Sequence, residues 1–297
     1  ADWAKITSDG SKTDLPFMPE NGLWSRVNSE ADFCLGIRCS RRDECFVLKA
    51  RREAASAKVL VVNHHLLFSD LALRIRGAGF ENSAVLPPFQ RIIFDEAHNM
   101  ESSATSFFSE SLNKFVVLKI LSRLYAVKRG RAFGVIVRLE ALSGERRGLK
   151  DIPSLIEDVR DRMLKLDQSA LAFTSESFTY RLKGRADDEV RSGLLAPIGE
   201  FQAAALRLIE RLSGILEGLD DEAGENIDAF EARILTGRLS RASALCESFT
   251  RYEEDSDHIF WLERQASGRG NPLPNFPSPL SRSRESWRRL SLPLSRP

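Results

Sequence analysis

The feature that most constrains this chain is a short apolar run that ends in two adjacent acids: residues 92–98 are Ile-Ile-Phe-Asp-Glu-Ala-His. A continuous apolar run rich in β-branched residues is typical of a buried parallel strand. Ligands of open α/β sheets bind at the carboxyl ends of such strands, where Asp95 and Glu96 are expected to lie. The simpler alternative is a strand that leads into a helix, with Asp95 as the N-cap and Glu96 favouring the helix dipole.

The chemistry that suits such a pair is nucleotide hydrolysis. The first acid, Asp95, can hold a Mg²⁺ ion that bridges nucleotide phosphates, usually through water. The second acid, Glu96, can orient and deprotonate the attacking water. An Asp-Glu pair alone is common, but the apolar run before it and Ala97-His98 after it make the pattern specific.

Three of the four cysteines, Cys34, Cys39 and Cys45, are close together in the sequence, whereas Cys246 stands far downstream. This spacing does not resemble a disulfide framework and favours a thiolate cluster in a reducing compartment. The three thiolates are suitable ligands for an iron–sulfur cluster or zinc, and the lack of Cys-x2-Cys disfavours a zinc ribbon. A fourth ligand is either Cys246 or, as we favour, a cysteine further upstream. The alternative is three unrelated free thiols.

The rest of the chain alternates between strand and helix patterns. Residues 41–58 are good helix formers, and residues 59–62 form a second apolar run typical of a parallel strand. Asn63, His64 and His65 follow; we expect Asn63 to cap the next helix, the alternative being a place near nucleotide or DNA. Residues 258–263 are a third strand candidate. The fold class expected is α/β with a large helical insertion.

From about residue 100 to 255 the apolar spacing is helical, with breaks near 144–148, 175–188 and 220–226. Three sets of apolar residues are predicted to line helix faces: Leu118, Leu121 and Leu124; Ile156, Val159, Met163 and Leu166; and Leu206, Ile209, Leu212 and Leu216.

Charge is balanced over the whole chain, with 43 basic and 42 acidic residues, but it is uneven along it. Residues 114–150 carry ten basic residues against two acids, an excess that suits a phosphate backbone or, equally, a solvated helix face. The basic residues are Lys114, Lys119, Arg123, Lys128, Arg129, Arg131, Arg138, Arg146, Arg147 and Lys150.

No apolar run is long enough to cross a membrane, and no signal peptide is visible.

Residues 95–98 resemble the DEAH box, the Walker B motif of superfamily 2 helicases. Together with the cysteines, the run from Cys34 to Met100 resembles the DinG/XPD family of iron–sulfur DNA helicases, and its Cys-x4-Cys-x5-Cys spacing is closer to the bacterial DinG-like branch. Further matching positions are Cys45-Phe46, Ala50-Arg51, Ala54, Ala57, Val61-Val62-Asn63-His64 and Leu66-Leu67.

The resemblance implies an ATP-dependent DNA helicase of the bacterial cytoplasm that uses ATP and Mg²⁺, moves 5′ to 3′ on single-stranded or forked DNA and has no membrane association. It implies that Asp95 positions Mg²⁺, Glu96 activates water and His98 couples nucleotide state to DNA. It also implies that Cys34, Cys39 and Cys45 hold a [4Fe–4S] cluster.

The expected fold is a partial RecA-like motor domain with an iron–sulfur segment and an arch-like helical insertion. The expected domains are residues 1–57 (rear of the cluster domain), 58–104 (motor domain 1 with the DEAH box), 105–255 (the insertion, whose basic run would line a single-strand channel) and 256–297 (return to motor domain 1).

The sequence departs from the family in two ways. It contains no Gly-x4-Gly-Lys-Ser/Thr phosphate loop and no cluster cysteine before residue 34. We therefore expect a fragment of a longer helicase that does not hydrolyse ATP by itself, because too few contacts hold the triphosphate. Two alternatives are a non-catalytic DNA- or protein-binding module with a structural cluster and a DinG-related nuclease. The authenticity of the Pro/Ser/Arg-rich tail from Gly270 is a separate open question.

Overall fold

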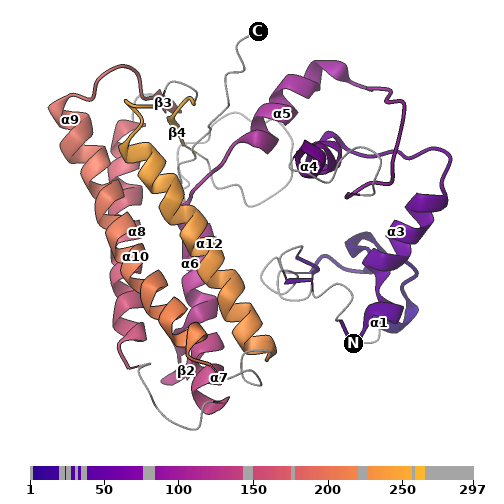
Figure 1. Cartoon of the computed structure of the whole chain (residues 1–297), viewed down its shortest axis with the longest axis horizontal. Helices are drawn as coiled ribbons and strands as arrows, with labels where there is room; N and C mark the ends of the chain where they lie inside the picture. The colour runs from indigo at the N-terminus through magenta and orange to yellow at the C-terminus, as the bar shows by residue number, and fades with distance from the viewer. Residues whose placement is uncertain are drawn as a thin grey trace. The chain divides into compact units, whose positions relative to one another are not determined.

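The computed structural model describes residues 3–19, 24, 28–30, 33–34, 39–75, 84–142, 150–174, 178–219, 226–255 and 258–264 (Figure 1). The tail from Gly270 lies outside these residues, as do Arg146 and Arg147. The chain divides into two compact units, residues 1–107 and 108–297. This division falls a few residues after the predicted start of the helical insertion, and the units are described separately below.

The first unit consists of short helices joined by extended segments. They are α1 (Trp3–Ile6), η1 (Lys12–Asp14), η4 (Arg42–Glu44), α3 (Phe46–Ser56), α4 (His64–Leu73), η6 (Ala97–Asn99) and α5 (Met100–Phe108). The α4 helix begins where Asn63 accepts a hydrogen bond from the backbone N–H of Leu66 at 2.8 Å. The capping role predicted for Asn63 is therefore confirmed.

The two strands predicted for this unit are not formed. Residues 59–62 and 91–94 have no strand partner among the described residues, and Val61 and Ile93 are each 96% exposed. An extended segment becomes a strand only when a neighbour accepts its backbone hydrogen bonds, and the described part of this unit offers none. The expectation of parallel strands at these positions is wrong for this structure, although the apolar composition that suggested them is present.

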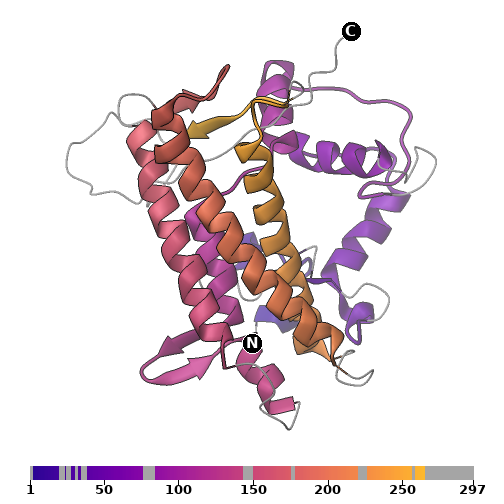
Figure 2. The same cartoon turned by 60° about the vertical axis from the view of Figure 1, so that its left-hand side comes forward.

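The second unit is a bundle of four long helices. It contains α6 (Lys114–Leu124), α7 (Val135–Leu142), α8 (Ile152–Phe173), the short α9 (Asp188–Val190), the π-helical turn η7 (Arg191–Leu195), α10 (Ala196–Glu217) and α12 (Ile227–Thr250). Helices α6, α8, α10 and α12 pack in that cyclic order, as Figure 2 shows. Asn113 caps α6 and Asn226 caps α12 through their side-chain oxygens, and a proline in the first turn begins α8. The helical character predicted for this block is confirmed.

The core of the bundle follows one of the predicted faces closely and two only in part. Ile156, Val159, Met163 and Leu166 of α8 are fully buried, as predicted. On α10, Leu212 and Leu216 are buried, but Leu206 is 42% exposed and Ile209 is only half-buried. The buried face of α10 instead continues through Leu208 and Phe201, because the large aromatic side chain determines the rotation of the helix.

On α6, Leu121 and Leu124 are buried as predicted, but Leu118 is half-buried because the buried face runs through Val117 and Ile120. Both errors have the same origin: leucines are common on a helix surface, and their spacing alone does not fix which face turns inward.

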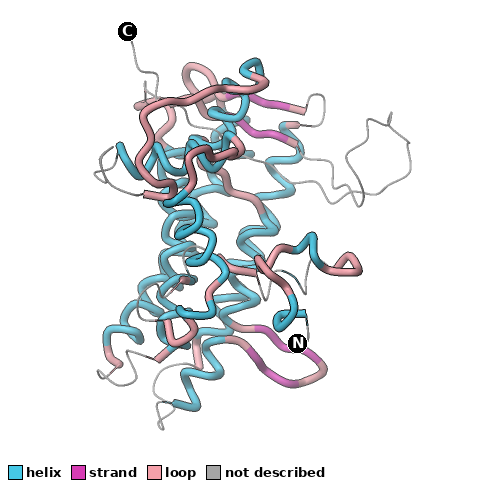
Figure 3. Tube along the Cα trace, turned by 90° about the vertical axis from the view of Figure 1, so that its right-hand side faces the viewer, coloured by secondary structure: helices cyan, strands magenta, loops and turns pink. Residues whose placement is uncertain are grey.

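Two small antiparallel sheets lie at opposite ends of this unit (Figure 3). Strands β1 (Ala126–Lys128) and β2 (Arg131–Phe133) form a hairpin between α6 and α7. Strand β4 (Trp261–Glu263) pairs with β3 (Thr179–Arg181). The predicted strand at 258–263 is thus present, but its partner is a strand of the helical unit, not a parallel strand of a motor domain. None of the described helices is long and apolar enough to span a bilayer.

Candidate functional site

The acidic segment lies in an exposed turn that leads into α5. Oδ1 of Asp95 accepts a hydrogen bond from the backbone N–H of Glu96 at 3.0 Å, so Asp95 organises the turn locally. Oε2 of Glu96 lies 3.3 Å from Nδ1 of His98, and both side chains are about two-thirds exposed. The structure thus brings Glu96 and His98 together and leaves all three side chains accessible to a ligand. It does not place them at a sheet edge.

Glu96 has a strained backbone. Its φ angle is 50°, in the left-handed region that non-glycine residues rarely adopt. A residue in this region costs roughly 1–3 kcal/mol, and such strain is concentrated at functional sites. Among the described residues of this unit other than glycine, the one with a positive φ is therefore the one for which catalytic chemistry is predicted.

Aromatic contacts join the acidic segment to α4. The ring of His64 stacks against Phe94, which immediately precedes Asp95, with a centroid distance of 6.3 Å. His64 also stacks against Phe68 of its own helix. The structure therefore brings together two motifs that are thirty residues apart in the sequence, and His64 makes a packing contact beside the candidate acids.

Sequence reasoning missed a buried ion pair that anchors this region. Asp70 of α4 and Arg74, the C-cap residue of that helix, are both buried, with Nε of Arg74 2.5 Å from Oδ2 of Asp70. Oδ1 of Asp70 accepts hydrogen bonds from the backbone N–H groups of Val85 and Leu86, and Arg74 donates to the carbonyls of Leu86 and Pro87. The pair therefore holds residues 85–87 against α4, just before the acidic segment. The signal was available, since an acid four residues before an arginine lies on the same helix face.

The cysteines are not gathered into one site. Cys34 is exposed, Cys39 and Cys45 are half-buried, and Cys45 occupies the N-cap position of α3. Within the part of the chain that the structure describes, no three His, Cys, Asp or Glu residues are grouped so that they could hold a metal ion. The thiols have the right chemistry for an iron–sulfur cluster but do not converge as one would require, so no mechanistic step is derived through a cluster.

Cys246, the alternative fourth ligand, belongs to the helical unit. It is 1% exposed and packs in the core of the bundle on α12. This burial disfavours Cys246 as a cluster ligand, and a cysteine further upstream stays the favoured prediction.

Much of the predicted basic run is neutralised inside the bundle. Lys114 pairs with Asp167 of α8, Arg123 with Glu231 of α12, and Arg138 with both Asp228 and Glu231. These cations hold helices together and are not available to line a channel. Each of the two interpretations of the run covers only part of it: Lys114, Arg123 and Arg138 are structural, whereas Lys128, Arg129 and Arg131 lie exposed on the β1–β2 hairpin and its turn.

A second charge network crosses from α8 to α10. Hydrogen bonds from Arg207 and Arg162 lower the pKa of Asp158, and those from Lys165 and Arg162 lower the pKa of Glu200. The two acids in turn raise the pKa of Arg162. Because these groups are largely solvated, the network adds modest stability and fixes the register of the two helices.

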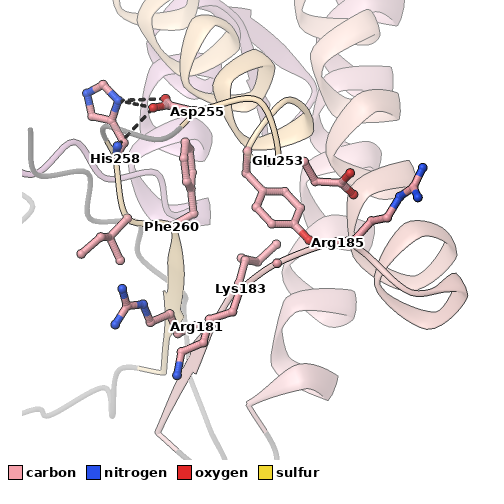
Figure 4. Close-up of a pocket in the computed structure, with 11 residues that line it drawn as sticks. Arg181, Lys183, Arg185, Glu253, Asp255, His258 and Phe260 are labelled. Carbon is pink, nitrogen blue, oxygen red and sulfur yellow. Dashed lines mark hydrogen bonds and ion pairs between the residues drawn. The ribbon is translucent and has the colours of Figure 1, made fainter. Parts of the chain in front are cut away.

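A cavity of about 440 Å³ lies between residues 181–185 and residues 252–260, at the end of the bundle that carries β3 and β4 (Figure 4). Its two acids are already engaged: Asp255 pairs with Nδ1 of His258 at 2.8 Å, and Glu253 pairs with Arg191 at 3.0 Å. Burial raises the pKa of Tyr252, which also lines the cavity. Its remaining charged lining consists of the cations Arg181, Lys183 and Arg185.

Comparison with known proteins places this chain beside bacterial helicases. It is 36% identical over 119 residues to the ATP-dependent DNA helicase YoaA of Escherichia coli, a match that covers 40% of this chain and 18% of that protein. It is 37% identical over 111 residues to YoaA of Haemophilus influenzae, covering 37% of this chain and 17% of that protein.

The ATP-dependent helicase DinG of Mycobacterium tuberculosis is 37% identical over 111 residues, which is 37% of this chain and 16% of that protein. No family model matches the chain. The chain thus spans less than a fifth of the length of these curated relatives. Within that limit the resemblance drawn from the motifs is confirmed, and the chain contains a DinG-like helicase region of about 110 residues.

Proposed function

We propose that this chain is the part of an ATP-dependent DNA helicase that carries the hydrolytic acids, the cysteine segment and a helical insertion. The observation that carries the proposal is that this chain is 36% identical over 119 residues to a protein named ATP-dependent DNA helicase. Residues 95–98 of this chain are the motif Asp-Glu-Ala-His. The complete protein would couple ATP hydrolysis to 5′ to 3′ movement along single-stranded DNA and to the opening of forks, in the bacterial cytoplasm.

The proposed roles follow from what each side chain can do. Asp95 would hold Mg²⁺, since it is exposed and its Oδ2 has no hydrogen-bond partner among the described residues. Bound Mg²⁺ supplies charge neutralisation on the nucleotide phosphates. Glu96 would orient and deprotonate the attacking water. His98, 3.3 Å from Glu96, would respond to changes at that carboxylate and pass them towards α5.

The phosphates need further contacts. The sequence has no Gly-x4-Gly-Lys-Ser/Thr loop, so we propose that residues elsewhere in a longer protein hold the triphosphate. The matched relatives, of which this chain spans less than a fifth, support that proposal.

The ATPase proposal is tested with the protein expressed from its complete coding sequence. Replacing Glu96 by Gln is expected to lower the DNA-stimulated ATPase rate by about 100-fold or more, the usual effect of losing a general base. Glu101→Gln is the matched control, because Glu101 is an exposed acid of α5 that is given no role. An unchanged rate in Glu96→Gln, or hydrolysis that does not require DNA, would overturn the proposal.

The cysteine proposal is tested separately. We propose Cys34, Cys39 and Cys45 as three ligands of a [4Fe–4S] cluster, on the strength of their chemistry and spacing. Anaerobic purification with iron and sulfide analysis should show iron that is lost in Cys34→Ser and Cys45→Ser. Cys246→Ala is the control, because the buried thiol lies in the core of the other unit and its loss should leave the iron content unchanged. A colourless, iron-free protein would end this part of the proposal without affecting the ATPase test.

A second candidate is a non-catalytic binding module. It is favoured by one observation: Asp95 and Glu96 lie in an exposed turn with no strand partner for residues 91–94 among those described. The same ATPase measurement separates the two candidates. A binding module would bind DNA but would not hydrolyse ATP, so Glu96→Gln would have no ATPase activity to lower.

A further inference from the structure

Three cations of the basic run lie on one small element. Within the described residues, no acid forms an ion pair with Lys128, Arg129 or Arg131, and all three are exposed. They occupy the β1–β2 hairpin and its turn, which projects from the helices in Figure 2. Lys114, Arg123 and Arg138 of the same run are thus paired with acids, whereas the cations of the hairpin are available to an external anion.

The pairing of the two strands places an aromatic ring beside these charges. Lys128 is paired with Arg131, and Ala126 with Phe133, in the antiparallel register. Paired residues and those two positions along a strand share one face, so Lys128, Arg131 and Phe133 lie together. Phe133 is 45% exposed, and no described residue covers it in a ring contact. One face of the hairpin therefore presents two cations and an aromatic ring to solvent.

The turn carries a third cation at a conformational cost. Arg129 and Gly130 have φ angles of 52° and 75°, the pattern of a two-residue type I′ turn. This turn favours Asn, Asp or Gly at its first central position, and a long side chain is disfavoured there. The arginine places its guanidinium at the tip of the hairpin, beyond Lys128 and Arg131.

The hairpin is also fixed to the bundle at its base. Gly134 has a φ of 127°, and a Cβ at this position would clash with the backbone carbonyl of Leu124. The end of β2 therefore packs directly against the end of α6. The charged face is presented by a positioned element, which lowers the entropy lost when a ligand binds.

We propose that this face binds a segment of single-stranded DNA. Phosphates would contact Lys128, Arg129 and Arg131, and an unpaired base would stack on Phe133. A single strand fits better than a duplex, since the bases of a duplex are stacked on one another and offer no open face to Phe133. The choice of DNA as the nucleic acid rests on the proposed helicase function.

Binding is measured by fluorescence anisotropy with a labelled 15-nucleotide oligothymidylate, using the 297-residue chain without ATP. Lys128→Ala/Arg131→Ala should weaken binding at least tenfold in low salt. It should also reduce the slope of log affinity against log salt by about 1.4, since each phosphate contact to a single strand contributes about 0.7. Phe133→Ala should weaken binding about tenfold, and Phe133→Tyr should restore it, because the ring that stacks on a base is retained.

Two controls separate binding from folding and from total charge. Arg181→Ala/Lys183→Ala removes the same charge from the opposite end of the unit and should leave affinity within twofold. Arg129→Gly should weaken binding while leaving the thermal melting temperature unchanged or higher, because glycine accepts the positive φ that arginine resists. A purely structural role for the hairpin predicts no loss of affinity in this variant.

The proposal is overturned if the wild-type chain does not bind the oligonucleotide, or if the two charge-removing variants weaken binding equally. It is also overturned if polyglutamate competes as well as unlabelled oligothymidylate and Phe133→Ala has no effect, which would indicate a surface for any polyanion or an acidic protein. These outcomes do not depend on ATP hydrolysis, so the helicase proposal is judged by the Glu96→Gln experiment alone.

Discussion

The two units use similar amino acids in opposite ways. In the helical unit, apolar side chains such as Val159 and Leu208 are fully buried, and most helix cations have acidic partners. In the first unit, Val61 and Ile93 are almost fully exposed in segments with no strand partner among the described residues. The helical unit thus buries its apolar side chains and pairs most of its helix cations through its own contacts. The apolar segments of the first unit are suited to burial, but the described residues of that unit do not cover them.

The largest expected effect lies in the buried network of Asp70 and Arg74 in the first unit. Asp70→Ala leaves Arg74 buried without its partner, which costs about 3–5 kcal/mol. Hydrogen exchange should show loss of protection in α4 and residues 85–87, with the helical bundle unchanged. Glu44→Ala, which breaks the exposed Arg41–Glu44 pair, is the control and should change nothing. Equal loss of protection in both units would contradict the expectation that each unit is stabilised by its own contacts.

A matched pair of leucines on α10 tests the packing of the bundle. Leu208 is fully buried, whereas Leu206 is 42% exposed. Leu208→Ala should lower the free energy of unfolding by about 2–5 kcal/mol, and Leu206→Ala by less than about 1 kcal/mol. Urea denaturation followed by circular dichroism measures both. If Leu206 proved the more sensitive, the rotation assigned to α10 would be incorrect.

Acid should weaken the bundle through its surface network. The folded-state pKa values of Asp158 and Glu200 lie below their ordinary values of 3.8 and 4.5. Stabilisation from a lowered carboxylate pKa is fully present above the ordinary value and is lost as the pH falls through the folded value. Unfolding midpoints should therefore fall below pH 4.5, and Arg162→Ala should reduce that acid dependence. An identical pH profile in the variant would show that the network contributes nothing.

The smallest effect is expected at the exposed apolar positions. Ile93→Thr should change the stability of this chain by less than about 0.5 kcal/mol, because the side chain is 96% exposed. In the protein made from the complete coding sequence, the same change is expected to lower ATPase activity, because Ile93 lies two residues before Asp95 and its apolar side chain is suited to contacts that the described residues do not make. If Ile93→Thr changed neither the stability of this chain nor the ATPase activity of the complete protein, the exposed apolar segment would have no packing partner in either protein.

Sequence reasoning succeeded where a pattern depends on neighbouring residues. Asn63 caps α4 as predicted, and the α8 face through Ile156 and Met163 is buried, because both depend on spacing within one helix. It failed where the outcome depends on distant partners. Residues 91–94 have the composition of a strand, but strand formation requires a neighbour that composition does not specify.

The candidate site shows the same limit. The motif located Asp95, Glu96 and His98, and the structure adds the contact between Glu96 and His98. No local signal revealed the hydrogen bonds that Asp70 accepts from the backbone N–H groups of residues 85 and 86. Likewise, the sequence shows how many cations the basic run contains, but not which of them are paired with acids. Pairing with Glu231, more than ninety residues downstream, decides which arginines remain available.

The π-helical turn η7 has a consequence for how this unit tolerates change in length. It adds one residue to the path between α9 and α10, and both Val190 before it and Leu194 within it remain buried. Deleting one residue from 191–195 would restore regular α-helical hydrogen bonding but rotate α9 by about 100° relative to α10. Val190 would then turn towards solvent. Related proteins that lack the extra residue should therefore carry a compensating shift in the apolar pattern on one side of this turn.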